Sequence, residues 1–291
     1  MGISSIYPER HGAGTFSVMK SARANENEVV RAALEKKFLL GVVHLRPLPG
    51  SPRYTGESLD ALAAAARADA EAILSSGFDG YIVENFGDAP FFKGAVPPHV
   101  LTLMTRIVLS LPRDGKIVGV NVLRNDARGA LAVSAACGLQ LIRVNVHAGA
   151  MVTDQGIIEG RAALTLRERR CIAPKLAIFA DIDVKHATPL GTGFDLAEAA
   201  KETARRGLAD ALIVTGRATG SPASLADVRT ARDAVPGVPI FVGSGVTRDS
   251  VREILRAAHG VIIGTALKLG ENVEAPVDPA RARDIAVEAR K

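Results

Sequence analysis

The sequence predicts an α/β protein: a single (β/α)8 TIM barrel with an N-terminal capping helix. From Lys37 onward, short β-branched apolar runs alternate with longer Ala-, Arg- and Leu-rich segments of helical spacing. Eight such units in strict alternation indicate a closed parallel barrel with its helices outside. The chain has 291 residues, of which 47% are hydrophobic, which suits one domain of this kind. The first run ends in HLRPLPGSP rather than a Gly-rich dinucleotide turn, which disfavours an open doubly wound sheet.

The elements follow one another in order along the chain. The predicted strands cover residues 38–45, 78–86, 116–124, 139–148, 175–186, 208–217, 238–246 and 260–269. The predicted helices cover residues 58–77, 97–111, 127–138, 165–174, 194–207, 224–237, 247–260 and 278–291. Several of them open with Ser, Thr or Asp and end at Gly, as helix caps require. The amphipathic segment 25–37 is expected to cap the barrel bottom, so we predict a flexible leader over 1–24 and a barrel domain over 25–291.

Composition excludes several classes of function. The net charge is +5, but no cluster of basic residues with interleaved aromatics predicts a nucleic-acid partner. No apolar run is long enough for an integral membrane segment, and the N-terminus lacks a secretory signal. Cys137 and Cys171 form no disulfide framework and suit core thiols in a reducing cytosol. We therefore expect a cytoplasmic protein with a small-molecule partner, and a homo-oligomer is compatible with the sequence.

Charged and amide residues gather at the predicted strand ends, where barrels of this fold carry their active sites. Alternation places Asp181, Asp183 and Lys185 on one face of the fifth strand. It places Arg143, Asn145 and His147 together on one face of the fourth. The other strand-end candidates are His44, Glu84 and Asn121.

Burying these groups is costly unless they pair or bind a ligand. One interpretation is a purely structural salt-bridge network, Arg143 with Asp181 and Lys185 with Asp183. The other is a polar catalytic site in which Asp181 and Glu84 are candidate bases and Lys185 or His44 candidate acids. Arg143, Asn121 and Asn145 would then hold substrate oxygens. A divalent metal (Mg²⁺, Mn²⁺ or Zn²⁺) is a further alternative, held among Glu84, Asp181, Asp183 and His186 or His44, although no metal-binding spacing supports it.

Small residues end the last strands. The glycine-rich ends comprise Gly216 after the sixth strand, Gly243, Ser244 and Gly245 after the seventh, and Gly264 and Thr265 after the eighth. Exposed backbone N–H groups at these strand ends commonly bind phosphate in this fold, and glycine lets the anion approach closely. The simpler interpretation is that these glycines only permit tight turns. We expect Thr247 or Asp249 to cap the intervening helix. Lys268 is a further candidate to contribute to the phosphate site, although a residue this far past a strand end is more often solvated.

Two unusually long segments follow the second and fourth strands. They are ENFGDAPFFKGAVPPH, which contains Asp88, and HAGAMVTDQGIIEGRAAL, which contains Asp154 and Gln155. A long loop over a barrel mouth often acts as a lid, although plain variable surface is the alternative.

With these motifs in place, the sequence resembles the BtpA/SgcQ family of predicted TIM-barrel proteins. The matching segments run from about Gly41 to Lys268 and include GVVHLRPLPGSP, GYIVENFGDAPF, VGVNVLRNDA, IRVNVHAGAMVTDQGIIEG, LADALIVTG and VGSGVT. The resemblance implies similarity to ribulose-phosphate-binding barrels. One branch of the family is associated with photosystem I biogenesis and another with sugar utilisation, and the resemblance carries no agreed catalytic residue.

The leading hypothesis is an enzyme acting on a phosphorylated sugar or similar small phosphate ester. Its reaction would be isomerase, epimerase or aldolase-type proton transfer next to a carbonyl. The alternatives are a non-catalytic assembly or regulatory factor of the photosystem I biogenesis type that retains a phosphate-ligand pocket, and a metal-dependent hydrolase.

Overall fold

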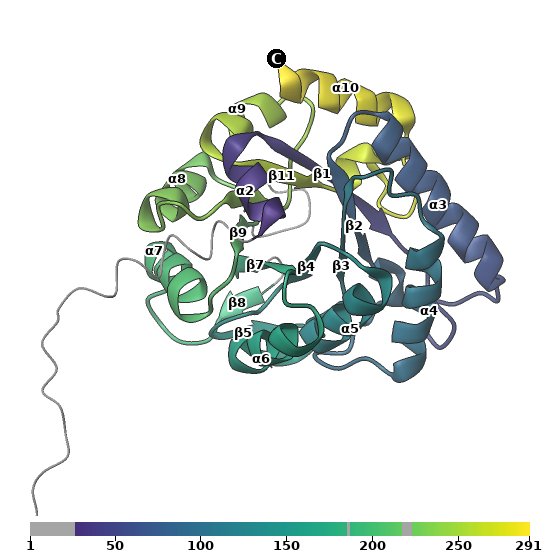
Figure 1. Cartoon of the computed structure of the whole chain (residues 1–291), viewed down its shortest axis with the longest axis horizontal. Helices are drawn as coiled ribbons and strands as arrows, with labels where there is room; N and C mark the ends of the chain where they lie inside the picture. The colour runs from purple at the N-terminus through teal and green to yellow at the C-terminus, as the bar shows by residue number, and fades with distance from the viewer. Residues whose placement is uncertain (1–26, 185–186, 217–222) are drawn as a thin grey trace, which may run out of the picture.

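The structure, a computed structural model, is a closed barrel of parallel strands surrounded by helices (Figure 1). It describes residues 27–184, 187–216 and 223–291. Around the barrel the strands follow the order β1-β11-β10-β9-β7-β4-β3-β2, so β1 closes against both β2 and β11. The predicted (β/α)8 fold is confirmed.

Every barrel strand lies within its predicted segment. The strands are β1 (Phe38–His44), β2 (Gly80–Glu84), β3 (Ile117–Asn121), β4 (Leu141–Val144), β7 (Ala177–Asp183), β9 (Ala211–Val214), β10 (Ile240–Val242) and β11 (Gly260–Ile263). The predicted strands are longer because their apolar pattern continues into the loops at each end.

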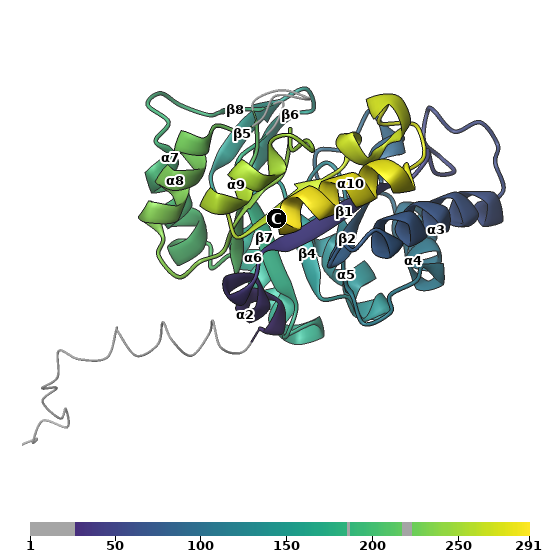
Figure 2. The ribbon, with the colours of Figure 1, turned by 90° about the horizontal axis from the view of Figure 1, so that it is seen from above.

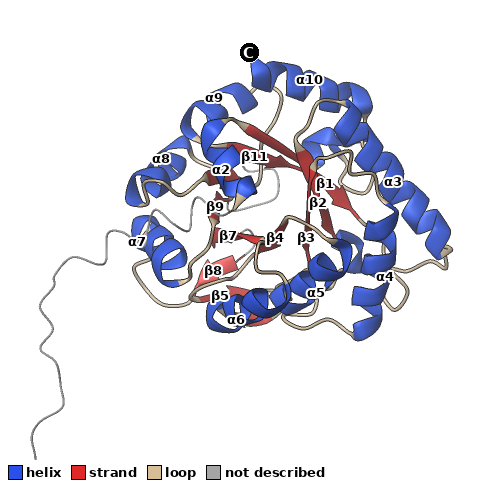
Figure 3. Cartoon of the chain, viewed as in Figure 1, coloured by secondary structure: helices blue, strands red, loops and turns tan. Residues whose placement is uncertain are grey.

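The helices alternate with the strands, as Figure 3 shows by colour. They are α2 (Glu28–Glu35), α3 (Leu59–Ser75), α4 (Pro98–Ser110), α5 (Ala127–Cys137), α6 (Ala162–Ile172), α7 (Leu196–Lys201), α8 (Leu225–Ala234), α9 (Val251–Ala257) and α10 (Pro279–Arg290). A π-helical turn, η2 (Glu202–Arg206), continues α7. Short 3-10 turns follow β2 (η1, Phe86–Asp88) and β11 (η3, Thr265–Leu267, and η4, Leu269–Glu271).

Strand alternation divides the core into two layers. In β7, Ile178 and Ala180 face the helices, whereas Phe179 faces the barrel interior. The interior layer also contains Val29 and Val30 of α2, in one cluster with phenylalanine side chains of β1, β7 and β10. Asn27 caps α2 by accepting from the N–H groups of both valines. The expected capping helix therefore closes the N-terminal end of the barrel and leaves the C-terminal end for a site.

The segment after β4 is not an open loop. It folds as a hairpin of β5 (Ala150–Thr153) and β6 (Gly156–Glu159), and β5 also pairs with β8 (Ala187–Pro189), which follows β7. Figure 2 shows these three strands together beyond the end of the barrel opposite α2. Backbone pairing therefore joins the two segments that leave β4 and β7.

Asp126 links the segment after β2 to the start of α5. One carboxylate oxygen caps α5 by accepting from Gly129 N at 2.8 Å, and the other accepts from Val96 N at 2.9 Å. The helix ends at Gly138, whose φ of +63° is the left-handed conformation that glycine adopts without strain.

Candidate active site

A buried ion pair occupies the C-terminal half of the barrel interior. The Arg143 guanidinium forms a two-pronged contact with Asp181, with Nε 3.0 Å from Oδ1 and Nη2 3.1 Å from Oδ2. Asn145 Nδ2 donates to Asp181 Oδ2 at 2.9 Å. Three N–H donors therefore occupy the Asp181 carboxylate, which makes it a poor general base and a good anchor for Arg143.

Neighbouring strands complete this polar cluster. Arg143 Nη1 donates to Glu84 Oε1 at 3.3 Å, and Asn121 Nδ2 bridges Glu84 Oε1 and Asn145 Oδ1 at 3.2 and 3.3 Å. All five side chains are buried, from 1% exposed for Asn121 to 9% for Arg143. Although burial alone would lower the pKa of Arg143, the nearby Asp181 and Glu84 carboxylates raise it above its usual value. Arg143 is thus a fixed positive charge in the barrel interior.

His44 lies at the end of β1 beside this cluster. Its Nε2 is 4.0 Å from Glu84 Oε2, the carboxylate oxygen that faces away from Asn121. Its ring stacks at a tilt on Phe86, with the ring centroids 4.6 Å apart. His44 and Glu84 are therefore placed as a pair that can relay a proton at the mouth.

The glycines after β10 and β11 lie next to these functional side chains. A Cβ added to Gly243 would be 3.2 Å from Arg143 Nη2, and one added to Gly264 would be 2.9 Å from His44 Cε1. Because β10 and β11 are neighbours, the two strand ends are adjacent. The backbone N–H groups of Ser244, Gly245, Gly264 and Thr265 donate to no acceptor within the described residues. This combination can receive an anion.

The surroundings of these glycines differ from the predicted arrangement in one respect. Helix α9 begins at Val251 rather than Thr247, and its N-cap Ser250 makes no side-chain cap. Ser244 Oγ accepts from Gly216 N at 2.6 Å, so the ends of β9 and β10 are tied together. Neither Thr247 nor Asp249 caps the helix, because a turn intervenes in which the Ser250 hydroxyl binds Thr247 N.

Other predicted residues lie elsewhere. The Asp88 carboxylate accepts hydrogen bonds from Leu48 N at 2.8 Å and from Asn85 Nδ2 at 3.2 Å, and burial raises its pKa. Asp154 and Gln155 form the turn between β5 and β6 and hydrogen-bond to each other.

His147 does not share a face with Arg143, because β4 ends at Val144 and the chain then turns. Its Nε2 lies 2.7 Å from Gly207 O, outside the barrel, and burial lowers its pKa. Asp183 follows a register shift in β7, and Lys185 and His186 lie outside the described residues. Within the part of the chain that the structure describes, no three His, Cys, Asp or Glu side chains are grouped so that they could hold a metal.

Arg124 was missed by the sequence reasoning. It follows β3, is partly buried, and lies within electrostatic reach of Asp181, Glu84 and Asp154. Burial lowers its pKa below the usual value, and the carboxylates oppose that effect. The sequence could have indicated this role, because Arg124 lies in NVLRND directly after a strand end, where a basic side chain can turn toward the barrel mouth.

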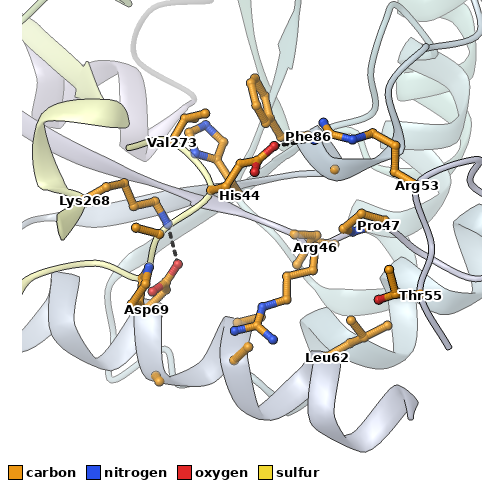
Figure 4. Close-up of a pocket in the computed structure, with 18 residues that line it drawn as sticks. His44, Arg46, Pro47, Arg53, Thr55, Leu62, Asp69, Phe86, Lys268 and Val273 are labelled. Atoms are coloured by element: carbon orange, nitrogen blue, oxygen red, sulfur yellow. Dashed lines mark hydrogen bonds and ion pairs between the residues drawn. The ribbon is translucent and has the colours of Figure 1, made fainter. Parts of the chain in front are cut away.

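A cavity of about 450 Å³ opens beside the mouth, between the segment after β1, helix α3 and the segment after β11 (Figure 4). His44 and Phe86 form the wall nearest the barrel. Lys268, which the sequence suggested would be solvated, is only 1% exposed and pairs with Asp69 at 2.5 Å. That expectation was wrong because the chain folds back after β11 and buries Lys268 against α3.

Comparison with protein families identifies the chain. The BtpA family model matches residues 35–291. The chain belongs to the BtpA family. Relatives in this family include the photosystem I biogenesis protein BtpA of Synechocystis sp., which is 48% identical over 244 residues and 84% of each chain. An uncharacterized protein of Pyrococcus furiosus is 44% identical over 249 residues, 85% of this chain and 93% of its own.

Solved structures resemble this BtpA-family chain in fold alone. Phosphoribosyl anthranilate isomerase from Thermus thermophilus has a TM-score of 0.51 at 12% identity, covering 87% of this chain and 98% of its own. Orotidine 5′-phosphate decarboxylase from Pyrococcus horikoshii has a TM-score of 0.52 at 13% identity, covering 87% and 100%. No described helix combines the length and apolarity needed to cross a membrane.

Proposed function

We propose that this BtpA-family protein is an enzyme that binds a small phosphate ester at the barrel mouth and moves a proton next to a carbonyl. The phosphate would lie against the N–H groups around Gly245 and Thr265, which need no dedicated cation to attract an anion. One observation carries the proposal: the two glycine positions that border this anion site adjoin Arg143 and His44. An ester held there would bring its carbon skeleton to the groups that can react with it.

The proposed roles follow from the contacts. His44 would transfer the proton, with Glu84 orienting its ring and balancing its charge. Arg143 would stabilise the developing enediolate oxygen, because Asp181 and Glu84 use only three of its five N–H groups. Asn121 would position Glu84, since both of its N–H groups are donated to Glu84 and Asn145. Asp181 would hold Arg143 rather than act as the base, since both of its oxygens are occupied.

Phosphate binding is tested with Thr265→Asp and Thr265→Asn. Thr265 begins the 3-10 turn η3, where an aspartate is tolerated, but its charge would repel an anion. In calorimetric titrations we expect wild type and Thr265→Asn to bind inorganic phosphate and ribose 5-phosphate, and Thr265→Asp to bind at least 10-fold more weakly. Equal affinity in all three proteins would exclude the anion site.

Proton transfer is tested without knowing the product. A panel of sugar phosphates is incubated with the protein in D₂O, and loss of a C–H signal next to the carbonyl is followed by NMR. We expect exchange with wild type and loss of exchange with His44→Gln, while phosphate affinity is retained. Exchange that survives in His44→Gln would remove His44 from the mechanism.

A second candidate function is a non-catalytic assembly factor that keeps the phosphate pocket. It is favoured by the internal pairing of Arg143 with Asp181 and Glu84, which leaves these charges satisfied without a substrate. The photosystem I biogenesis protein of Synechocystis is also a close relative. Phosphate binding with no C–H exchange across the whole panel would favour this candidate over the enzyme.

A further inference from the structure

The cavity beside the mouth has the size of a ligand site and shares one wall residue, His44, with the surroundings of the proposed anion site. Its volume of about 450 Å³ lies within the usual range for small-molecule pockets. His44 belongs to both places, because it lines the cavity and its ring also lies against the Gly264 position. A ligand whose phosphate binds beside Gly264 would therefore reach the cavity by passing His44.

The walls of the cavity favour a flat body. On one side α3 contributes alanines, among them Ala65 and Ala66, whose small side chains leave room for a ring. On the other side the Phe86 ring, stacked on His44, presents an aromatic wall. Planar rings pack well against such a wall, in offset or edge-on contacts.

Lys268 gives the cavity a specific polar group. Its ammonium has three N–H donors, and Asp69 Oδ2 is its single acceptor among the described residues. The other Asp69 oxygen accepts from Val277 N at 2.7 Å, so the carboxylate is fully engaged. A buried ammonium with donors left over is costly unless something accepts from it. Since Lys268 lines the cavity, its remaining N–H groups can donate to an oxygen of a ligand bound there (Figure 4).

We infer that the substrate is a phosphate ester carrying a planar ring with a carbonyl oxygen. Its ring occupies the cavity between Phe86 and Ala65, and its carbonyl accepts a hydrogen bond from Lys268. This inference rests on the proposed function, since it assumes the phosphate beside Gly264. It adds to that function the chemical class of the group attached to the sugar.

The test compares two matched substitutions on α3. Ala65 lines the cavity, whereas Ala64 is exposed on the same helix and does not. Ala65→Phe would fill the cavity, and Ala64→Phe would add the same side chain to the outer surface. The ligands are inorganic phosphate, ribose 5-phosphate, UMP and IMP, the last two carrying carbonyl-bearing rings of different size.

We expect wild type and Ala64→Phe to bind UMP or IMP at least 10-fold more tightly than ribose 5-phosphate. Ala65→Phe should lose this advantage and keep its affinity for inorganic phosphate and ribose 5-phosphate. If wild type binds ribose 5-phosphate as tightly as both nucleotides, the inference is wrong and the proposed function stands. An advantage that persists in Ala65→Phe also overturns it. If no ligand binds, the proposed function fails and the inference falls with it.

Discussion

Asp181→Asn should destabilise the protein strongly, because Arg143 would lose its charge partner inside the barrel. The substitution keeps the shape of the side chain but removes the negative charge and replaces one acceptor oxygen with an NH₂ group. At least one of the three N–H groups that now point at Asp181 would then lack an acceptor, which costs about 1–3 kcal/mol. Among the described residues, Arg143 would keep Glu84, at 3.3 Å, as its remaining ion-pair partner.

Breaking a buried ion pair by removing one partner typically costs about 3–5 kcal/mol, and we expect a loss in that range. A domain of this size loses roughly 2–4 °C in melting temperature per kcal/mol. Viewed from the sequence alone, Asp181 is a candidate base whose replacement would affect turnover far more than stability. Because three N–H groups donate to its carboxylate, we now expect Asp181→Asn to lower both turnover and stability.

The assay is urea unfolding followed by circular dichroism at pH 7. The matched control is Asp60→Asn, which removes an aspartate from a highly exposed pair with Arg106 and should behave as wild type. Arg143→Met in the Asp181→Asn background should cost less than Arg143→Met alone, since the pair is already broken. A loss below about 1 kcal/mol for Asp181→Asn, with an unchanged denaturant slope, would refute the account of this ion pair.

Three further predictions concern stability and reactivity. Asp126→Ala should lower the free energy of unfolding in urea by about 2–3 kcal/mol, because it removes both the cap of α5 and the hydrogen bond from Val96 N. Ser224→Ala removes only the cap of α8 and should cost about 1 kcal/mol. Equal losses would contradict a stabilising role for the bond from Val96 N. Burial, together with nearby positive charge, lowers the pKa of His259 to about 4. Below pH 6.5 the unfolded chain therefore binds a proton at His259 that the folded chain does not bind, so the free energy of unfolding should fall between pH 6.5 and 4. His259→Asn should flatten this part of the pH profile, and an unchanged profile would show that other groups cause it. The expectation of a core thiol was correct for Cys137, which is buried, but wrong for Cys171, which is exposed. Maleimide should therefore label Cys171 in the native protein and Cys137, whose thiol pKa is raised by burial, only after unfolding, as peptide mapping would reveal.

Local patterns in the sequence were enough to predict the barrel and the position of its polar interior. Alternation in β4 and β7 puts Arg143 and Asp181 on the inward face without any knowledge of their contacts, because strand parity is a property of neighbouring residues. Parity fails where a strand ends, which is why His147 was misplaced by the turn after Val144.

The cavity could not be predicted in this way. Lys268 and Asp69 are 199 residues apart and meet only because α3 and the segment after β11 are brought together when the barrel closes. No residue pattern within either segment predicts the contact between Lys268 and Asp69. The hairpin of β5 and β6 was also missed, since the segment was interpreted as a loop from its length and its glycines.

The sheet of β5, β6 and β8 has a consequence for how a ligand reaches the barrel. Its ladder joins the segments after β4 and β7, and Leu190 N adds a further bond to Ala150 O, so opening this side would break several backbone hydrogen bonds at once. The opposite side of the mouth is bordered by the segments after β1 and β11, which are bridged by an exposed ion pair of Arg53 with Glu274. An exposed pair of this kind opens at little cost. Of these two described sides of the mouth, we therefore expect a ligand to enter past Arg53, and to reach the cavity before it reaches Arg143.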